Sequence, residues 1–312
     1  MSGPWRALII LIVLSGIFTA IAPHFLSFQN LTNITLATAT IGILAIGAAF
    51  VLGGRGLDLS VGSVIALSGV AAVQFTHWLG LAWPATIVLC LIVGASAGIA
   101  NGFVVTRMRV PPFIATLGML GIARGLALSI SGGRPIYGLE QPLVWLGQGR
   151  LLGIPIPAIL FLCLGLIAHL VLTRTRFGTY TLAIGSNHAA AAKAGIRVRR
   201  HNLKLYALSG LLAGVAGLVF IGRVNAADPA VGTMYELTAI TAAIIGGTNL
   251  FGGRASVIGA MLGALIMGVL QNGLNLMAVP SYYQQILIGL ILIVAVWLDS
   301  ISNKEQPNVV GG

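Results

Sequence analysis

The sequence predicts an all-α integral membrane protein with about ten transmembrane helices and with both termini in the cytoplasm. Of its 312 residues, 57% are hydrophobic and only 7% are charged, and several apolar runs reach the roughly 20 residues that a helix needs to cross a bilayer. The basic residues gather in the links on one side of these runs. A water-soluble domain of this length cannot bury so much apolar sequence, so we expect a single transmembrane domain over residues 1–312.

Ten apolar runs, separated by polar residues or by Gly and Pro, carry the predicted spans. They are residues 7–23, 35–53, 60–76, 84–105, 113–131, 156–173, 205–222, 237–251, 255–277 and 285–299. The first run also has features of a signal peptide, because Arg6 precedes it and Ala20-Ile21-Ala22 offers small residues for cleavage. Pro23 disfavours cleavage there, so we expect this run to remain as the first span.

The distribution of Lys and Arg predicts which links face the cytoplasm. With the N-terminus inside, the cytoplasmic links hold thirteen of the 17 basic residues: Arg6, Arg55, Arg107, Arg109, Arg174, Arg176, Lys193, Arg197, Arg199, Arg200, Lys204, Arg254 and Lys304. The other links hold Arg134, Arg150 and Arg223, and Arg124 lies within the fifth span. The positive-inside rule therefore explains the net charge of +11, and we expect these charges to meet membrane lipid and not nucleic acid.

The sequence gives no sign of a metal, a cofactor or a catalytic residue. Cys90 and Cys163 lie in apolar runs without a CxxC partner, which favours small buried side chains. The five histidines have no ligand spacing. No GxxxxGK[ST] loop for nucleotide phosphates occurs, so the chain is predicted not to be an enzyme.

Glycines recur at four-residue spacing in several spans. The sets are Gly94, Gly98 and Gly102; Gly210 and Gly214; and Gly259 and Gly263. Small residues at this spacing let membrane helices approach closely, although a chain with 42 glycines also produces such sets by chance.

Two parts of the chain resemble each other at an offset of 193 or 194 residues, which predicts an internal repeat of two halves. Residues 14–22 resemble 208–216, and residues 53–65 resemble 246–258. The second pair contains two glycine-rich breaks. In transporters, breaks at equivalent places in two halves mark the binding or gating region, and two ordinary turns at span ends are the alternative.

Short motifs follow one another along nearly the whole chain. They are Gly56-Leu57-Asp58-Leu59-Ser60-Val61-Gly62-Ser63, Pro112-Phe113-Ile114-Ala115-Thr116-Leu117-Gly118, Arg176-Phe177-Gly178, Ala183-Ile184-Gly185-Ser186-Asn187, Ala194-Gly195-Ile196, Tyr235-Glu236-Leu237, Gly246-Gly247-Thr248 and Asn272-Gly273-Leu274-Asn275-Leu276. In this order and spacing they resemble the permeases of bacterial ATP-binding-cassette (ABC) importers for ribose, related sugars and the sugar-like signal autoinducer-2.

The resemblance implies a permease subunit in the bacterial cytoplasmic (inner) membrane, and it implies the partners that such a permease needs. These are two cytoplasmic ABC ATPase domains, a periplasmic or extracellular sugar-binding protein, and a second permease that is either another copy or a paralogue. The chain departs mildly from the family at Gly56-Leu57-Asp58, where Gly-Ile-Asp is common, and at Gly253-Arg254-Ala255, where Gly-Lys or Gly-Val-Gly is common. These departures concern the identity of the solute more than the family.

The longest predicted cytoplasmic link, residues 174–204, is strongly basic. Ser186-Asn187 can cap a short helix through residues 189–194, and Gly195 can end it. The resemblance implies that this link couples the permease to its ATPase, and it places the role on Asn187, Ala191, Ala192, Ala194 and Gly195. The alternative is a basic link that holds the orientation of the chain against anionic lipid.

Polar residues in the spans and breaks are candidates for the translocation path or gate, because such residues tend to face water or the bundle interior. The candidates are Asp58, Ser60, Asn101, Thr248, Asn249, Asn272 and Asn275, with Gln271 beside them. Amides can donate to and accept from hydroxyl groups, but hydrogen bonds between helices explain each amide equally well.

Three further charged residues carry expectations of their own. Arg124 is expected to snorkel outward or to pair with Glu140 or Glu236. Asp228, Glu236 and residues 132–155 offer an outer surface for a docking binding protein, unless these carboxylates are simply solvated.

Other classes of function fit the sequence less well. A permease for branched-chain amino acids shares the architecture but usually lacks the run at residues 57–63. A secondary carrier driven by ions would need acidic residues in mid-membrane, and a membrane-embedded enzyme would need a convergent catalytic set.

Overall fold

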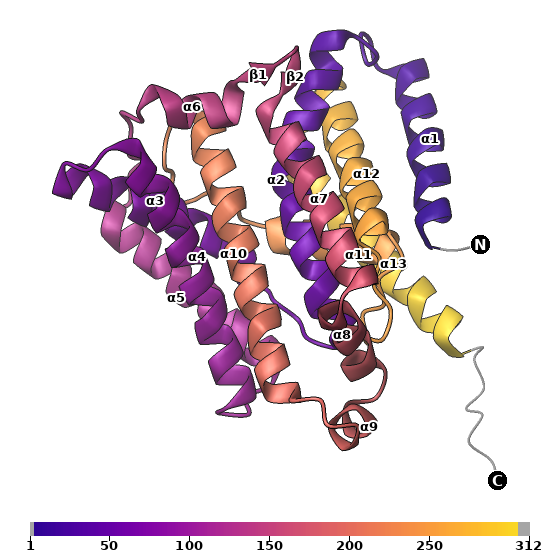
Figure 1. Ribbon diagram of the computed structural model, residues 1–312. Helices are drawn as coiled ribbons and strands as arrows, with labels where there is room; N and C mark the ends of the chain where they lie inside the picture. Colours follow the sequence, from indigo (N-terminus) through magenta and orange to yellow (C-terminus); the bar gives the residue numbers. More distant parts are fainter. Residues whose placement is uncertain (1–2, 305–312) are drawn as a thin grey trace.

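The computed structural model describes residues 3–304, which are almost entirely helical (Figure 1). The elements are α1 (Gly3–Ile21), α2 (Phe28–Gly53), α3 (Val61–Leu79), α4 (Trp83–Thr106), α5 (Pro112–Ser131), α6 (Gln141–Gln148), β1 (Arg150–Leu151), β2 (Ile154–Pro155), α7 (Ile156–Arg174), α8 (Arg176–Ser186), α9 (His188–Lys193), α10 (Val198–Val224), α11 (Tyr235–Ile245), α12 (Val257–Leu276) and α13 (Ser281–Lys304). Strands β1 and β2 form a small antiparallel hairpin.

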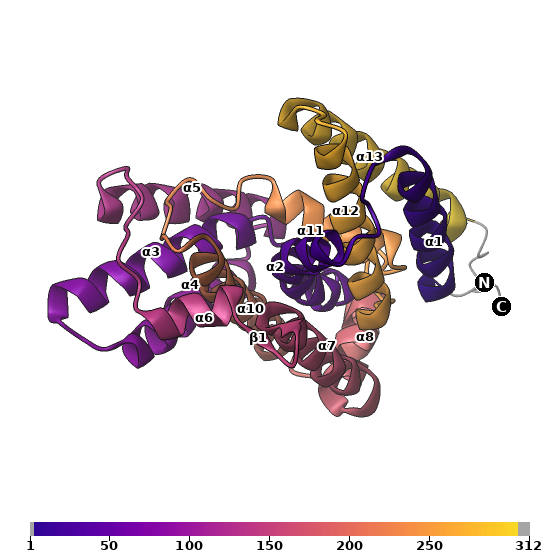
Figure 2. The same ribbon diagram turned by 90° about the horizontal axis from the view of Figure 1, so that it is seen from above.

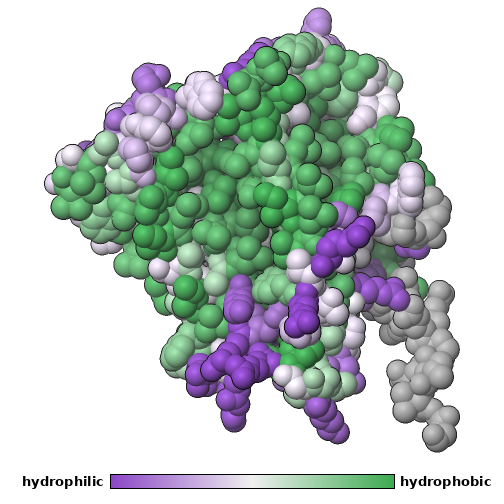
Figure 3. Space-filling model, in the orientation of Figure 1, coloured by the Kyte–Doolittle hydropathy of each residue, from purple (hydrophilic) through white to green (hydrophobic). Residues whose placement is uncertain are grey.

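Nine helices of the described part are long and apolar enough to cross a membrane, namely α1, α2, α3, α4, α5, α7, α10, α12 and α13. Large apolar side chains such as Ile12, Leu166 and Ile293 are exposed on them, and an apolar belt covers the middle of the molecule (Figure 3). A water-soluble protein rarely exposes so large an apolar surface. The predicted all-α fold of a multi-pass membrane protein is therefore confirmed.

The eighth predicted span, residues 237–251, differs in the structure. Its place is taken by α11, whose 11 residues are too few to cross a bilayer at 1.5 Å per residue. Segment 225–234, which contains Pro229 and the left-handed Gly232 (φ 79°), first leads the chain back from the end of α10. Segment 225–234 and α11 together return the chain toward the end of the bundle where α10 began (Figure 1). Successive crossings of the bundle therefore still run in opposite directions.

The two ends of the bundle differ in charge. Helices α8 and α9 and the start of α10 lie at one end, where hydrophilic side chains gather (Figure 3). We call it the basic end because its exposed residues include Arg107, Arg109, Arg174, Arg176, Lys193, Arg197, Arg199, Arg200 and Lys204. The other end, which carries α6 and the β-hairpin, is called the opposite end below. Figure 2 shows the bundle along this direction.

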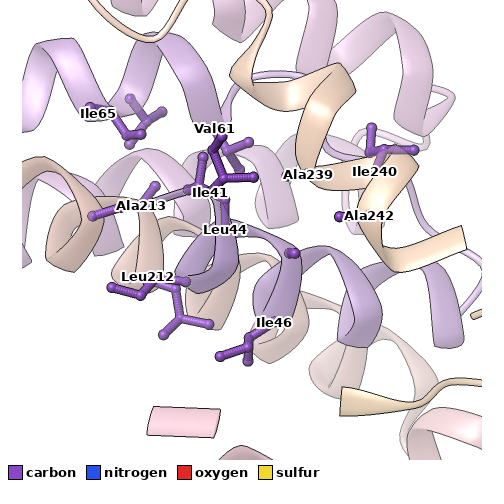
Figure 4. Close-up of a cluster of buried hydrophobic side chains, with 14 of the residues drawn as sticks. Ile41, Leu44, Ile46, Val61, Ile65, Leu212, Ala213, Ala239, Ile240 and Ala242 are labelled. Atoms are coloured by element: carbon purple, nitrogen blue, oxygen red, sulfur yellow. The ribbon is translucent and has the colours of Figure 1, made fainter. Parts of the chain in front are cut away.

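The apolar core lies where α2, α3, α10 and α11 meet (Figure 4). It contains Ile41, Leu44, Ile46, Val61, Ile65, Leu212, Ala213, Ala239, Ile240 and Ala242. Most of these side chains are small or β-branched, so the helix axes can lie close together.

The glycine sets pack helices together, as the sequence predicts. Gly94 and Gly98 of α4 face Gly210 and Gly214 of α10, and a Cβ on Gly98 would lie 3.0 Å from the Cα of Gly210. Gly263 of α12 lies equally close to the backbone of α11. A larger side chain at these positions would force the helices apart.

Candidate functional site

Three predicted path residues, Asp58, Ser60 and Asn101, form one buried group with Ser209 of α10, which we call the Asp58 cluster. Asp58 Oδ1 accepts hydrogen bonds from Ser60 N (3.0 Å) and Ser60 Oγ (2.6 Å), and Asp58 Oδ2 accepts from Ser209 Oγ (2.8 Å). Asn101 Nδ2 donates to Ser60 Oγ (2.8 Å) and lies 3.5 Å from Asp58 Oδ1. All four side chains are at most 6% exposed, so the cluster ties segment 54–60 to α4 and α10.

Two members of this region were not predicted as site residues. Ser209 entered the sequence analysis only through the internal repeat, and Tyr206, whose hydroxyl donates to Leu57 O (3.3 Å), was not considered. Both are polar residues within the seventh span, and that position is the signal that could have found them.

The two glycine-rich breaks lie against each other at the basic end. Helices α2 and α11 both end in a Schellman motif, and the two motifs are shifted by one residue relative to the sequence match. The bonds are Gly56 N to Val51 O (2.8 Å), Arg55 N to Leu52 O (2.8 Å), Thr248 N to Ala243 O (3.0 Å) and Gly247 N to Ile244 O (2.8 Å). Gly253 N of the second break donates to Gly53 O of the first (3.0 Å).

Gly185, near the end of α8, fits between these two breaks. A Cβ on Gly185 would overlap Gly53 O and Gly253 N, and a Cβ on Gly253 would lie 3.1 Å from the Cα of Ser186. We call Gly53, Gly185 and Gly253 the three-glycine junction. Because α9 follows α8 after Asn187 alone, the junction connects the coupling candidate to both breaks.

The short helix predicted after Ser186-Asn187 is present as α9. Asn187 Oδ1 accepts from Ala190 N (2.9 Å) and so caps its start. Gly195 follows its end in the left-handed region (φ 83°). The other coupling candidates differ in exposure, since Ala191 is 5% exposed and packs with Ile184 and Val198, whereas Ala192 and Ala194 are exposed.

Thr248 and Asn249, also predicted for the path, shape the second break. Thr248 Oγ1 accepts from Ser256 N (3.2 Å), and Asn249 Oδ1 accepts from Phe251 N (2.7 Å). Thr248 is 1% and Asn249 9% exposed. The path candidates are therefore divided among the Asp58 cluster, the second break and the opposite end.

The remaining path candidates, Asn272 and Asn275, lie on α12 toward the opposite end. Asn272 and Asn30 of α2 exchange two hydrogen bonds, Asn30 Nδ2 to Asn272 Oδ1 (2.9 Å) and Asn272 Nδ2 to Asn30 Oδ1 (2.8 Å). Asn275 Oδ1 accepts from Gln284 Nε2 of α13 (2.8 Å). These asparagines line a cavity of about 420 Å³, whose wall also includes Gln271.

The structure gives Arg124 and the two docking candidates specific surroundings. Arg124 Nη1 donates to the carbonyl oxygens of Pro229 and Val231 (2.7 Å to Val231 O) and so holds segment 225–234 by its backbone, and its charge also interacts with Glu236, one of the two carboxylates expected as its partner. Glu236 is 9% exposed and lies against Gly62 at the start of α3, so little of its carboxylate is exposed, and its role in docking stays a prediction. Asp228 is half-buried, and its Oδ1 accepts from Ala230 N (2.8 Å).

Comparison with known proteins decides the family. Residues 30–296 match the family described as "Branched-chain amino acid transport system / permease component". The chain belongs to this permease family.

The relatives of this permease extend over nearly its whole length. The ribose import permease protein RbsC is 39% identical in Escherichia coli (96% of this chain, 94% of that one) and 41% identical in Bacillus subtilis (95% and 92%). The D-allose transport system permease protein AlsC of Escherichia coli is 36% identical (95% and 91%). Among solved structures, PsaBC from Streptococcus pneumoniae in complex with Fab is a distant likeness, with a TM-score of 0.48 at 14% identity over 88% of this chain and 91% of that one.

Within the described residues of the permease, no group of three or more His, Cys, Asp or Glu side chains could hold a metal ion. Cys90 is buried, as expected, but Cys163 is exposed. The expectation for Cys163 was wrong because a residue in an apolar span can face outward as well as into the protein.

Proposed function

We propose that this permease is the transmembrane subunit of an ATP-driven importer for a sugar or sugar-like solute, such as a ribose-type monosaccharide or autoinducer-2. The observation that carries the proposal is identity of 35–41% over at least 90% of the chain with permeases named for ribose, D-allose and xylose. The family description names branched-chain amino acids, but these relatives favour a sugar.

The basic end faces the cytoplasm in this proposal. The positive-inside rule supports that orientation, and it would place α8 and α9 where two ABC ATPase domains can bind. A sugar-binding protein would deliver the solute at the opposite end, and a second permease, a copy or a paralogue, would complete the membrane part. Both termini would be cytoplasmic, although residues 1–2 and 305–312 lie outside the described part.

Coupling in this proposal runs through residues 174–204. An ATPase that closes against α9 would displace α8, because only Asn187 separates the two helices. The end of α8 fits tightly between both glycine-rich breaks at the three-glycine junction. A displacement of α8 would therefore move the ends of α2 and α11 together.

The function is tested with the permease purified together with the ABC ATPase and the sugar-binding protein that this proposal requires, which are sought among the neighbouring genes. Ribose, allose, xylose and autoinducer-2 are each added with the binding protein, and ATP hydrolysis and solute import into proteoliposomes are measured. We expect at least one of them to stimulate hydrolysis and to be imported. Stimulation by leucine, isoleucine or valine alone would instead assign the permease to branched-chain amino acids.

The exposed face of α9 offers a test of coupling. Ala192→Trp places a large ring on this face, so we expect sugar-stimulated ATP hydrolysis and import to fall at least about tenfold, as loss of one well-packed contact commonly does. Met108→Trp is the matched control, because Met108 is also exposed at the basic end (62%) but lies between α4 and α5. If Ala192→Trp reduces membrane insertion and leaves coupling intact, residues 174–204 only anchor the chain against lipid.

A further inference from the structure

The cavity toward the opposite end has a wall that is unusually polar for a membrane protein. It lies between the first turns of α2, the last turn of α10, the start of α11 and the end of α12. Asn33, Gln271 and Asn275 contribute amides, and Arg223 and Tyr235 contribute a guanidinium and a phenol. Its volume of about 420 Å³ falls in the range usual for small-molecule sites.

Several polar groups of this wall make no hydrogen bond within the described part of the protein. No hydrogen bond there involves the side-chain amide of Gln271, the amide nitrogens of Asn33 and Asn275, or the hydroxyl of Tyr235. The Asn30–Asn272 pair, by contrast, bonds to itself and holds α2 and α12 together on one side of the cavity. The pair fixes the shape of the wall, and the unpartnered groups remain available to a solute.

The chemistry of the wall selects among solutes. Amides both donate and accept, as hydroxyl groups do, and Ile41, Ala37 and Leu276 add an apolar surface that suits the carbon face of a sugar ring. The lining residues include Arg223 but no carboxylate, so the ammonium group of an amino acid would find no opposite charge.

We infer that this cavity is a transient binding site for a neutral polyhydroxylated solute of monosaccharide size, occupied after the solute enters the permease from the opposite end. The inference rests on the proposed function and adds to it the place and the chemistry of a first contact inside the permease. Gln271 and Asn33 supply the main hydrogen bonds.

The first test compares the sugar imported per ATP hydrolysed in proteoliposomes that contain the whole transporter. For Gln271→Leu and for Asn33→Leu, we expect this ratio to fall about three- to tenfold, as the loss of one hydrogen bond predicts. Gln285→Leu is the control, because Gln285 is an exposed amide of α13 outside the cavity, and its ratio should stay at the wild-type value. Gln271→Asn keeps the amide and should recover part of the loss.

The second test has a readout that does not depend on transport. A cysteine replaces Asn33, or Gln285 as the control, in a Cys163→Ser background, since Cys163 is exposed and Cys90 is buried. Labelling by a membrane-impermeant maleimide is timed with ribose, allose or xylose at high concentration. We expect one of these sugars to slow labelling of Asn33→Cys at least about threefold, and labelling of Gln285→Cys to be unaffected.

The outcomes separate this inference from the proposed function. If the wild-type transporter imports a sugar, but the Leu variants keep the wild-type ratio and no sugar slows labelling, the cavity inference is overturned and the function stands. If the wild type imports none of the sugars, the proposed function fails, and the cavity inference fails with it unless a sugar still protects Asn33→Cys.

Discussion

A Gly185→Val permease is expected to lose most of its ATP-driven import. Even a Cβ on Gly185 would overlap Gly53 O and Gly253 N, and both are backbone atoms that cannot move aside without breaking their mutual hydrogen bond (3.0 Å). Overpacking of this kind costs about 1–3 kcal/mol of the free energy of unfolding. The larger effect should be on import, at least about tenfold, because α8 would be pushed away from both breaks.

Import into proteoliposomes and thermal unfolding of the purified permease measure the two effects. Gly289→Val is the matched control, since Gly289 lies in α13 and a Cβ there would meet nothing within 4 Å. Gly185→Ala should give a smaller loss of import than Gly185→Val. If Gly185→Val keeps the import and the stability of the wild type, α8 does not pack tightly against the two breaks, and the three-glycine junction has no role in import.

Much of the fold could be predicted because bilayer thickness fixes the length of an apolar helix. The helices at 7–23, 35–53 and 84–105 appear as α1, α2 and α4 with modest changes at their ends. The exception is 237–251, where composition alone does not separate a full span from an 11-residue helix that follows a segment of turns. The two cases differ in segment 225–234, whose backbone is held by Arg124 of α5. This contact joins residues about 105 positions apart, so no local sequence pattern predicts it.

The candidate sites were predictable only in part. The cap on α9 depends on Asn187 and on residues next to it, so local sequence sufficed. The contact between the glycine-rich breaks, and the position of Gly185 between them, depend on three segments far apart in the chain. Glu236 was predicted to lie on an outer docking surface, but the packing of Gly62 against it leaves it only 9% exposed, and this contact joins residues far apart in the chain.

Asp58→Ala is expected to destabilise the permease by about 3 kcal/mol or more. Ser60 N, Ser60 Oγ and Ser209 Oγ would be buried donors without their carboxylate acceptor, and each unsatisfied buried group costs about 1–3 kcal/mol. Asp58→Asn should cost much less, since its Oδ1 can still accept from Ser60 and its amide nitrogen can donate to Ser209 Oγ. Thermal unfolding of the purified variants measures the difference, and equal stability of wild type and Asp58→Ala would refute it.

Import by the Asp58→Asn variant then decides between two roles for the Asp58 cluster. If Asp58 only holds segment 54–60 to α4 and α10, a variant that keeps its hydrogen bonds should import sugar at close to the wild-type rate. If Asp58 lies on the translocation path, as its position in the first break predicts, import should fall although stability is kept. The burial of all four side chains, each at most 6% exposed, favours the first result, because a solute could reach the carboxylate only after the first break had moved away from α4 and α10.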